Sequence, residues 1–488
     1  MKTTSLKHQR YRIEIRKKGN EEIFKRRRQN VDSSNPSDVD DDKIAAMSES
    51  RELIPYIKTA YRENDNSTFK FANKIVINNL FGRDTSLTIQ DLQESQLIDL
   101  MIEVFDKGNT EQSIQMGNIL MNILGIPDID LIYYINKGLF DSFYNKLMQP
   151  NQPIELIKVC LFGIGNFSSE VESIKELLIR EGFFNYMLNV YGLQMISEKI
   201  IFNDFVWIAS NCLVNIDRAT LHKYINNLNI LVDFLLEILK PGFPASCFLD
   251  SSMEYVLEIM DVLITVPVYC DKFIESKHVQ NKLNKLLLNS KYNSLVLKIL
   301  MRFIENSPIE LLANLLLNRK IDNYYFILKN SKKASLKTDV LLLLSNLVLN
   351  DKNWLLVISD EPFMEIVFTL ALDPQTTDSI LNEIYFLIGN LIYGLNSNNY
   401  KLLLDTPIID VLLKGFLSYN NKLRSILLEI LAVFLHKLYT IDIDSFNEIR
   451  EEIVNSRFYD KSQSIYNNLE SDNDKMKFEE IFNVLINE

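Results

Sequence analysis

The sequence predicts an all-α protein, a solenoid in which one short helical unit follows another along most of the chain. Glycine and proline number only 14 and 12 among 488 residues, so few of the breaks that separate sheet domains are present. Apolar residues make up 47% of the chain, which is enough to bury a large core. A short motif ending in asparagine also recurs about every 44 residues, as expected of a repeat array.

The prediction of helices depends on the spacing of the apolar residues. In Leu295–Ile304 and in Ile426–Phe434 they recur in steps of three and four, which places them on one face of a helix. Polar clusters interrupt this pattern, for example at Asn306–Pro308, Asp373–Pro374 and Asn396–Asn399. We therefore expect many short helices joined by polar turns.

The repeat itself is marked by a small residue followed by asparagine, with a large apolar residue four positions before the asparagine. The four pairs are Gly165-Asn166, Ser210-Asn211, Ser345-Asn346 and Gly389-Asn390, and the apolar residues are Phe162, Trp207, Leu342 and Phe386. Successive asparagines are 45, 135 and 44 residues apart, and Asn122 lies 44 residues before the first of them. The middle interval equals three periods of 45. A helical period of about 44 residues is typical of armadillo and HEAT repeats, although ordinary core helices in an asparagine-rich chain are the alternative.

Charge and composition divide the chain into three segments. Residues 1–30 contain 11 Lys and Arg and 3 Asp and Glu, a balance of +8, whereas the other 458 residues contain 41 and 61, a balance of −20. Residues 31–42 read VDSSNPSDVDDD and predict a flexible acidic linker. Residues 43–488 are predicted to form the solenoid, with about 9–10 degenerate repeats. The basic arm can bind an acidic partner or the acidic body itself, and the body disfavours direct binding of nucleic acid.

Other functional classes find little support in the sequence. The four cysteines, Cys160, Cys212, Cys247 and Cys270, have no paired spacing, which predicts buried free thiols in a reducing intracellular compartment. No apolar run has the length and composition of a signal peptide or a membrane span. The four histidines are scattered, and no P-loop, dinucleotide fingerprint, zinc-protease or nucleophile-elbow motif occurs. We therefore expect a soluble protein that is not an enzyme and needs no metal or cofactor.

The repeat motif resembles that of the importin-alpha family, the adaptors for nuclear localisation signals. Repeats of that family contain W-x-x-x-N on their third helix, and the segment WIASN at Trp207–Asn211 matches it in full. Residues 162–166 (FGIGN), 342–346 (LLLSN), 386–390 (FLIGN) and 118–122 (NILMN) keep the asparagine and replace the tryptophan. Near Asp261 and Arg302 neither residue is retained. The resemblance implies a right-handed armadillo superhelix with a concave binding groove.

The N-terminal arm supports the same resemblance. The arm looks like the family's importin-beta-binding region over residues 12–30, RIEIRKKGNEEIFKRRRQN. That region begins with apolar, acidic and basic residues in turn, and continues with an acidic pair, two apolar residues and a basic cluster. The arm departs from that pattern at Gly19 and has only His8-Gln9-Arg10 as an upstream basic group. The residues that the resemblance assigns to importin-beta binding and autoinhibition are Arg16, Lys17, Lys18, Lys25, Arg26, Arg27 and Arg28.

The resemblance also implies two peptide sites in the groove. The major site would consist of Asn122, Phe162, Asn166, Glu170, Trp207 and Asn211. The minor site would consist of Asn346, Glu383, Phe386 and Asn390. Asparagine amides can hold the peptide backbone, aromatic faces can order the stems of Lys and Arg, and the two glutamates can pair with the cations. Because only one tryptophan of the motif is present, we expect weakened or altered binding of basic peptides, above all at the minor site.

The function that the resemblance implies is nuclear import. The adaptor would bind cargo with basic localisation signals, join it to importin-beta through the arm, and shuttle between cytoplasm and nucleus. When free, the arm would occupy the groove. Whether the acidic C-terminal segment, Glu470–Glu488, serves an export factor is left open. The alternative is a general armadillo or HEAT scaffold for protein interactions, which explains the repeats and leaves the arm unexplained.

Overall fold

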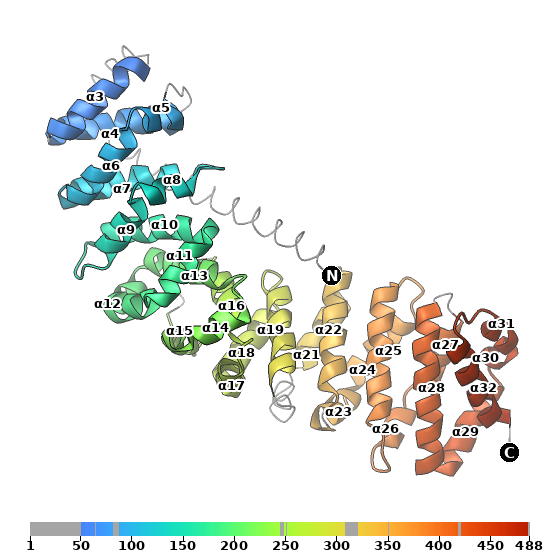
Figure 1. Ribbon diagram of the computed structural model, residues 1–488. Coiled ribbons are helices and arrows are strands. Elements are labelled where there is room, and N and C mark those ends of the chain that lie inside the picture. The colour runs from blue at the N-terminus through green and yellow to red at the C-terminus, as the bar shows by residue number, and fades with distance from the viewer. Residues whose placement is uncertain are drawn as a thin grey trace. The chain divides into compact units, whose positions relative to one another are not determined.

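The computed structural model describes residues 50–63, 65–81, 87–244, 248–249, 251–307, 321–349, 351–417 and 421–486. All regular structure within these ranges is helical, and no strand is found there (Figure 1). None of the described helices is long and apolar enough to span a lipid bilayer. The predicted basic arm (residues 1–30) and acidic linker (residues 31–42) lie outside the described residues.

The chain divides into two compact units, called here the N-terminal and the C-terminal unit. The N-terminal unit extends to Leu231 and includes Pro244–Ile259. The C-terminal unit consists of Val232–Phe243 and the residues from Met260 onward. Each unit is built from groups of consecutive helices, and in most groups the third helix is the longest.

The N-terminal unit begins with two helices, α3 (Ser50–Glu63) and α4 (Asn66–Phe81), and continues with groups of three. These groups are α5 (Ile89–Glu94), α6 (Leu97–Lys107) and α7 (Thr110–Leu124); α8 (Leu131–Asn136), α9 (Leu139–Leu147) and α10 (Ile154–Glu170); α11 (Glu172–Arg180), α12 (Phe183–Ser197) and α13 (Lys199–Leu213); and α14 (Arg218–Lys223), α15 (Ile225–Ile238) and α16 (Ser252–Leu263). The boundary between the two units runs through α15 and α16. Within the N-terminal unit α7 packs against α10, and α10 against α13, so that the third helices follow one another (Figure 1).

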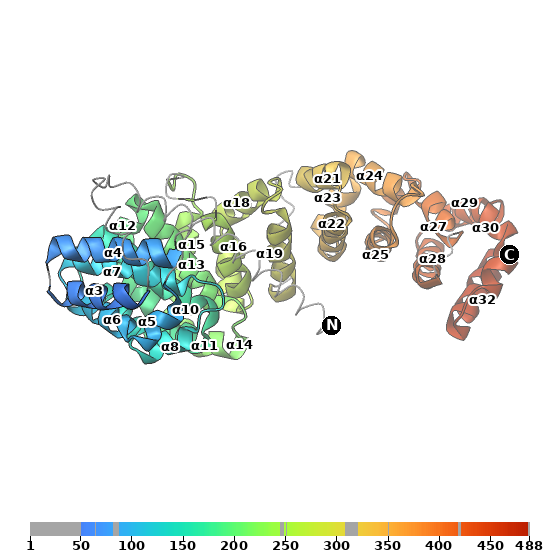
Figure 2. The same cartoon turned by 90° about the horizontal axis from the view of Figure 1, so that it is seen from above.

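The C-terminal unit continues the same arrangement. Its helices are α17 (Pro267–Glu275), α18 (Lys277–Leu287) and α19 (Asn293–Asn306); α21 (Ile321–Asn330) and α22 (Ala334–Leu347); α23 (Asp351–Ile358), α24 (Glu361–Leu372) and α25 (Asp378–Tyr393); α26 (Tyr400–Leu404), α27 (Ile408–Phe416) and α28 (Asn421–Ile441); and α29 (Ile443–Val454), α30 (Arg457–Asp460), α31 (Ser462–Asn467) and α32 (Asp472–Ile486). The second helices α21, α24 and α27 pack in one layer, and the third helices α22, α25 and α28 form another (Figure 2). The third-helix layer ends with α32, which packs against α28.

Local sequence signals explain where several helices begin. Asn109 and Gln112 form a reciprocal cap at the start of α7, in which the side chain of each accepts a hydrogen bond from the backbone N–H of the other. Between the first and second helices of three successive groups, one residue is left-handed: Gln96, Gly138 and Gly182, with φ of 57°, 78° and 71°. Glycine adopts this conformation without steric cost. The two glycines are 44 residues apart and mark the repeat independently of the asparagines.

The helical period predicted from the asparagine spacing is confirmed. Third helices begin at Thr110, Ile154, Lys199, Ser252, Asn293, Ala334, Asp378 and Asn421, that is 44, 45, 53, 41, 41, 44 and 43 residues apart. The 135 residues between Asn211 and Asn346 do span three units, because α16 and α19 lie between α13 and α22 in the chain. The steps there are uneven, and the longest includes the connection from α15 to α16. The prediction of an all-α, armadillo-like solenoid is therefore confirmed.

The prediction of buried free thiols is confirmed at three of the four cysteines. Cys160, Cys212 and Cys270 are buried and form no disulfide, whereas Cys247 lies outside the described residues. Burial raises the pKa of the Cys160 and Cys212 thiols well above the ordinary range, so both stay protonated. Within the described ranges no group of three His, Cys, Asp or Glu side chains is arranged to hold a metal ion.

Candidate functional site

The five asparagines of the repeat motif occupy the same register on their third helices, and we call them the asparagine row. Asn122 (α7), Asn166 (α10) and Asn211 (α13) belong to the N-terminal unit, and Asn346 (α22) and Asn390 (α25) to the C-terminal unit. The three side chains of the N-terminal unit are buried, and the two of the C-terminal unit are half-buried. Each unit therefore contains its own part of the predicted row.

In the N-terminal unit the asparagines tie neighbouring third helices together. The Nδ2 atom of Asn166 donates to the carbonyl oxygen of Met121 at 3.3 Å. The Nδ2 atom of Asn211 donates to the carbonyl oxygen of Gly165 at 3.4 Å. In both cases the acceptor is the residue just before the preceding asparagine of the row. The recurrence of asparagine after a small or flexible residue is thus explained by hydrogen bonding between repeats.

The same bond is found in the C-terminal unit. Asn390 donates to the carbonyl oxygen of Ser345 at 2.7 Å and to its hydroxyl at 2.9 Å. The first asparagine of each unit, Asn122 or Asn346, instead donates at 2.8 Å to the carbonyl four residues earlier in its own helix. The amide nitrogens of the row therefore already have acceptors within the protein. The Oδ1 atoms of Asn122 and Asn211 are buried and have no hydrogen-bond partner.

The aromatic positions of the N-terminal unit are closed. Trp207 is only 3% exposed, and the centroid of its ring lies 5.4 Å from that of Phe162. Met121 completes this cluster, and Tyr255 packs against it. Gly165 permits the arrangement, because a Cβ atom at that position would lie 2.1 Å from the Trp207 ring. The indole is therefore part of the core between α10 and α13.

This burial corrects the prediction that Trp207 and Phe162 offer open aromatic faces to a peptide. The two rings pack on each other and on the facing helices, because that buries a large apolar area. Glu170, at the end of α10, is exposed. The three asparagines of the predicted major site thus contribute to the packing of the helices. Glu170 is the residue of that site whose side chain is exposed.

The C-terminal unit, in contrast, has an open aromatic position. Phe386 is 47% exposed, and it lies on α25 four residues before Asn390, so that both lie on one face of the helix. Leu342, at the equivalent position of α22, is half-buried. Weak peptide binding was expected at the Phe386 position, because tryptophan is absent there. This ring is nevertheless the one with an exposed face.

Two carboxylates accompany this open position. Glu383 lies seven residues before Asn390, and Asp339 lies seven residues before Asn346, so each precedes its asparagine by about two turns. Burial and the negative charge of Asp339 raise the pKa of Glu383 above its ordinary value, and burial raises the pKa of Asp339. The Oε2 atom of Glu383 is buried without a hydrogen-bond partner. Asp339 is absent from the predicted site, although its distance of 44 residues from Glu383 is one period and could have identified it.

A buried ion pair links α16 and α19 near the start of the C-terminal unit. Asp261, which is buried on α16, accepts a hydrogen bond from Nε of Arg302 at 2.7 Å and pairs with Lys298. Arg302 and Lys298 lie one turn apart on α19. Two cationic side chains so close together disfavour a basic ligand side chain beside them.

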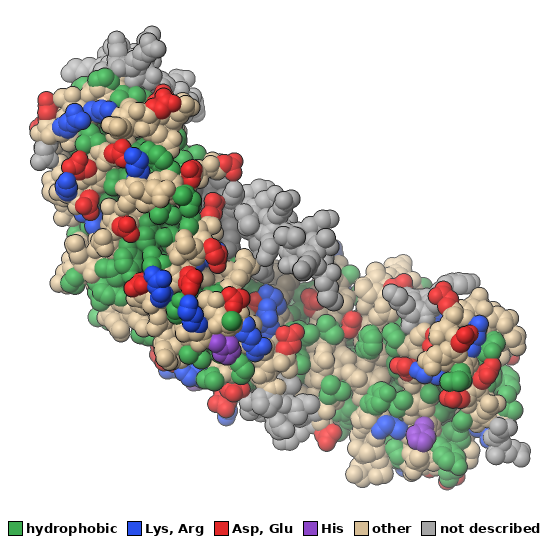
Figure 3. Space-filling view, in the orientation of Figure 1, with side chains coloured by type: hydrophobic (Ala, Val, Ile, Leu, Met, Phe, Trp, Pro, Cys, Tyr) green, Lys and Arg blue, Asp and Glu red, His purple; other side chains and the backbone are tan. Residues whose placement is uncertain are grey.

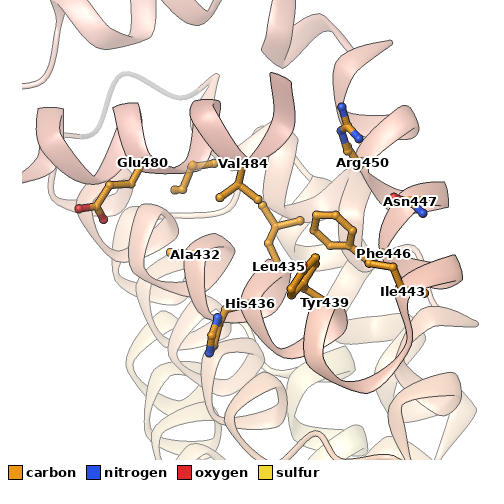
Figure 4. Close-up of a pocket in the computed structure, with 11 residues that line it drawn as sticks. Ala432, Leu435, His436, Tyr439, Ile443, Phe446, Asn447, Arg450, Glu480 and Val484 are labelled. Carbon is orange, nitrogen blue, oxygen red and sulfur yellow. The ribbon is translucent and has the colours of Figure 1, made fainter. Parts of the chain in front are cut away.

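A pocket of about 670 Å³ with a mixed lining lies between α28, α29 and α32 of the C-terminal unit. Its apolar lining includes Leu435, Tyr439, Phe446 and Val484, and its ionisable residues are His436, Arg450 and Glu480 (Figure 4). The rings of Tyr439 and Phe446 meet edge to face with centroids 5.3 Å apart. Arg450 is engaged, because its Nε donates to the carbonyl oxygen of Leu485 at 2.8 Å. The lining suits an apolar side chain and does not combine a nucleophile with a base.

Comparison with known proteins identifies similar structures but no similar sequences. The chain matches no protein-family model and no curated protein. Among solved structures it is similar to an engineered protein, with a TM-score of 0.57 and 13% identity over 89% of this chain and 98% of that one. It is also similar to a designed armadillo repeat protein in complex with the peptide (KR)4, with a TM-score of 0.41 and 16% identity over 51% of this chain and 99% of that one. A further designed armadillo repeat protein has a TM-score of 0.41 and 15% identity, over 51% of this chain and 99% of that one.

Proposed function

We propose that this protein is a nuclear import adaptor that binds the basic localisation signals of cargo proteins along its asparagine row. The observation that supports this most is a group of side chains on α22 and α25: the carboxylates Asp339 and Glu383, the open ring of Phe386, and Asn390. The proposed activity is binding and not catalysis. The proposed localisation is both cytoplasm and nucleus, between which the adaptor shuttles.

A lysine or arginine side chain of the ligand suits this group. Glu383 and Asp339 raise the local negative charge and are half-buried, so a cation beside them offsets their repulsion and supplies the partner that Glu383 Oε2 lacks. Phe386 can cover the alkyl stem of the ligand side chain, and its ring face attracts the cation. The carboxylates thus provide selectivity for basic residues.

The asparagine row can hold the backbone of the ligand. Since the amide nitrogens of Asn346 and Asn390 bond within the protein, their Oδ1 atoms are the groups left to accept peptide N–H donors. Asparagines placed once per repeat offer such acceptors at intervals along an extended peptide. Backbone hydrogen bonds contribute affinity without regard to the side-chain sequence.

In this proposal the N-terminal unit contributes less than the C-terminal unit. Trp207 and Phe162 remain in the core, so the N-terminal share consists of the exposed Glu170 and the Oδ1 acceptors of Asn122 and Asn211. Both acceptors are buried, and a peptide can reach them only where the row opens. The C-terminal unit is therefore the principal site, which reverses the ranking expected from the tryptophan motif.

The basic arm supplies the link to the carrier in this proposal. Its sequence, IEIRKKGNEEIFKRRR, supports binding to importin-beta, and its balance of +8 is opposite to the −20 of the remaining chain. Without a carrier, Lys25–Arg28 occupy the acidic positions of the row at a high effective concentration, because arm and row belong to one chain. Binding of importin-beta withdraws the arm and frees the row for cargo.

A titration with a fluorescent basic peptide tests the site. Phe386→Ala and Glu383→Gln should each weaken binding, by roughly two- to fivefold, because each removes one favourable contact with a cation. The matched controls are Phe326→Ala and Glu365→Gln, which remove an exposed ring from α21 and an exposed carboxylate from α24, both second helices. If the control variants lose as much affinity as the site variants, the site is wrong.

Deletion of residues 1–30 separates an adaptor from a general scaffold. The deletion should abolish capture by importin-beta and raise the affinity for the basic peptide. Loss of importin-beta binding with unchanged peptide affinity would remove the autoinhibition and keep the adaptor. An intact chain that fails to bind importin-beta would leave a general armadillo-like interaction scaffold as the function.

A further inference from the structure

A strongly basic stretch interrupts the acidic body of the chain. From Ser276 to Ile304 the sequence contains six Lys and Arg, one His and no Asp or Glu, whereas residues 31–488 have a balance of −20. The stretch forms α18 and most of α19 in the C-terminal unit. On the last helices of the same unit, α27 to α32, acidic and basic side chains are interspersed (Figure 3). The segregation of charge at α18 is therefore local.

Helix α18 is amphipathic, with an apolar side toward the unit and a basic side toward solvent. Val279, Leu283 and Leu287 recur every four residues and are buried. Ser276 caps the helix, since its side chain accepts a hydrogen bond from the backbone N–H of Val279. The exposed and half-exposed basic residues of the helix are Lys277, His278, Lys282 and Lys285.

The lysines of α18 have no anionic partners among the described residues. No ion pair within those ranges involves Lys277, Lys282 or Lys285, whereas Lys272 on the preceding helix lies 3.3 Å from Asp233. Burial and the neighbouring Lys285 lower the pKa of Lys282 below its ordinary value. Burial is the larger cause of this change, and the ammonium group of Lys285 adds to it.

We propose that α18 is a docking surface for a short acidic segment of a partner protein. Three lysines on the solvent side of the helix, two exposed and one half-buried, suit a small number of Asp or Glu side chains. The helix has 11 residues and is therefore about 16 Å long, the length of about five residues of extended peptide. Leu288, at its C-terminal end, is 48% exposed and adds an apolar contact to the charged ones.

A long polyanion suits this surface less well than a short peptide. Binding to nucleic acid gains strength with the number of phosphates that Lys and Arg neutralise along the strand. Here the cations are confined to one short helix, and residues 31–488 as a whole, with a balance of −20, repel a polymer that extends beyond it. A peptide with a few carboxylates ends before it meets that repulsion.

The surface is separate from the asparagine row. Helix α18 is the second helix of its group, while the row runs along third helices, and in the C-terminal unit second and third helices form different layers (Figure 2). An acidic partner on α18 and a basic ligand on α22 and α25 can therefore be bound together. A partner can dock on α18 whether or not the protein serves in nuclear import.

Lysine footprinting on the full chain tests this inference, because it reads each lysine separately from the basic arm. The protein is acylated with and without a short glutamate-rich peptide, and the rate at each lysine is measured by mass spectrometry. Lys277, Lys282 and Lys285 should be protected roughly threefold or more at low salt, and high salt should abolish the protection. Lys332 and Lys333, which are exposed in the same unit, should keep their rates.

Charge variants supply the matched comparison. The triple variant Lys277→Gln, Lys282→Gln, Lys285→Gln should lose roughly tenfold in affinity for the peptide. The variant Lys332→Gln, Lys333→Gln, Lys337→Gln removes the same charge at the start of α22 and should lose less than about twofold. Equal losses in the two variants would overturn the inference. So would tighter binding of single-stranded DNA, or of phosphatidylserine vesicles, than of the peptide at the lysines of α18.

Discussion

The asparagine row serves packing in both units, but the aromatic position beside it is closed in the N-terminal unit and exposed in the C-terminal unit. In both units an asparagine amide bonds to the backbone of the preceding third helix. Trp207 and Phe162 then fill the aromatic positions of the N-terminal unit and bury each other, whereas Phe386 remains exposed on the same helix face as Glu383. A repeat motif thus determines the position of a side chain on its helix. The side chains around that position determine whether the residue is buried in the core or exposed at the surface.

One neighbour is the residue just before the preceding asparagine. In α10 this residue is Gly165, and its missing side chain provides the space in which the Trp207 ring lies. In α22 the equivalent residue is Ser345, whose hydroxyl accepts a hydrogen bond from Asn390. The close approach that Gly165 allows is specific to Trp207, because Met121 holds this position in α7 and packs in one cluster with Phe162.

The other neighbour belongs to the following third helix. Phe162 is covered by Trp207 of α13. The residue of α28 that lies 43 positions after Phe386 is Glu429, which pairs with Lys477 of α32. An ion pair directed to α32 leaves the Phe386 ring uncovered, so the difference between the units depends on side chains from three successive repeats.

The largest expected effect is on stability. Trp207→Ala should lower the free energy of unfolding by about 3–5 kcal/mol, because it leaves a cavity beside Phe162 and Met121. Phe386→Ala removes a half-exposed ring and should cost less than about 1 kcal/mol. Urea unfolding of both variants measures the difference. Equal losses would mean that the two aromatic positions are equally buried.

A smaller loss of stability is expected from a substitution at Gly165, which lies against the Trp207 ring. Gly165→Ala places a methyl group against the Trp207 ring and should cost about 1–3 kcal/mol. Gly192→Ala is the matched control on α12, since a Cβ there meets no atom within 4 Å, and it should be neutral or stabilising by up to about 1 kcal/mol. Thermal unfolding compares them, and an unchanged melting temperature for Gly165→Ala would contradict the close packing.

The hydrogen bonds of the row predict a third difference. Asn390→Ala breaks the link between α25 and α22 and should cost about 1 kcal/mol. Asn346→Ala removes a hydrogen bond within one helix, and the carbonyl oxygen that accepts it keeps its backbone partner in the helix. The free energy of unfolding should therefore fall by only a few tenths of about 1 kcal/mol. Urea unfolding again measures both. A larger loss for Asn346→Ala would show that the row does not connect the repeats.

The smallest expected effect is the pH dependence of ligand binding at the open site. The raised pKa of Glu383 means that the folded state holds this proton more tightly than the unfolded state does, so the stability contributed by this group declines as the pH rises through that pKa. A cation binds only the ionised form. Basic-peptide affinity should therefore fall on acidification from neutral pH toward about pH 5, and Glu383→Gln should reduce that fall. An unchanged pH profile in the variant would exclude Glu383 as the titrating group.

The fold could be predicted from the sequence because its signal repeats. An inter-repeat bond needs an asparagine once per period, and this leaves a regular pattern even where two intervening units depart from it between Asn211 and Asn346. The link between α16 and α19 is instead a pair of charged side chains, Asp261 and Arg302. Boundaries of individual units were less predictable, because the step from α13 to α16 is 53 residues.

The candidate site was less predictable than the fold. Matching Trp207–Asn211 to a motif identifies the residues but not their exposure, which depends on Gly165, 42 residues earlier. Asp339 could have been found by counting one period back from Glu383. The net charge of the whole chain does not indicate the basic surface of α18, because it averages over all residues. The absence of Asp and Glu from residues 276 to 304 is nevertheless visible in the sequence.

Hydrogen exchange with and without a basic peptide tests most directly whether the C-terminal unit holds the ligand. Binding beside Glu383 and Phe386 should slow the exchange of amides in α22 and α25, because a bound peptide stabilises the helices that it contacts. The amides of α10 and α13, around Trp207, should keep their rates. Slowing confined to α10 and α13 would contradict the assignment and make the N-terminal row the binding site.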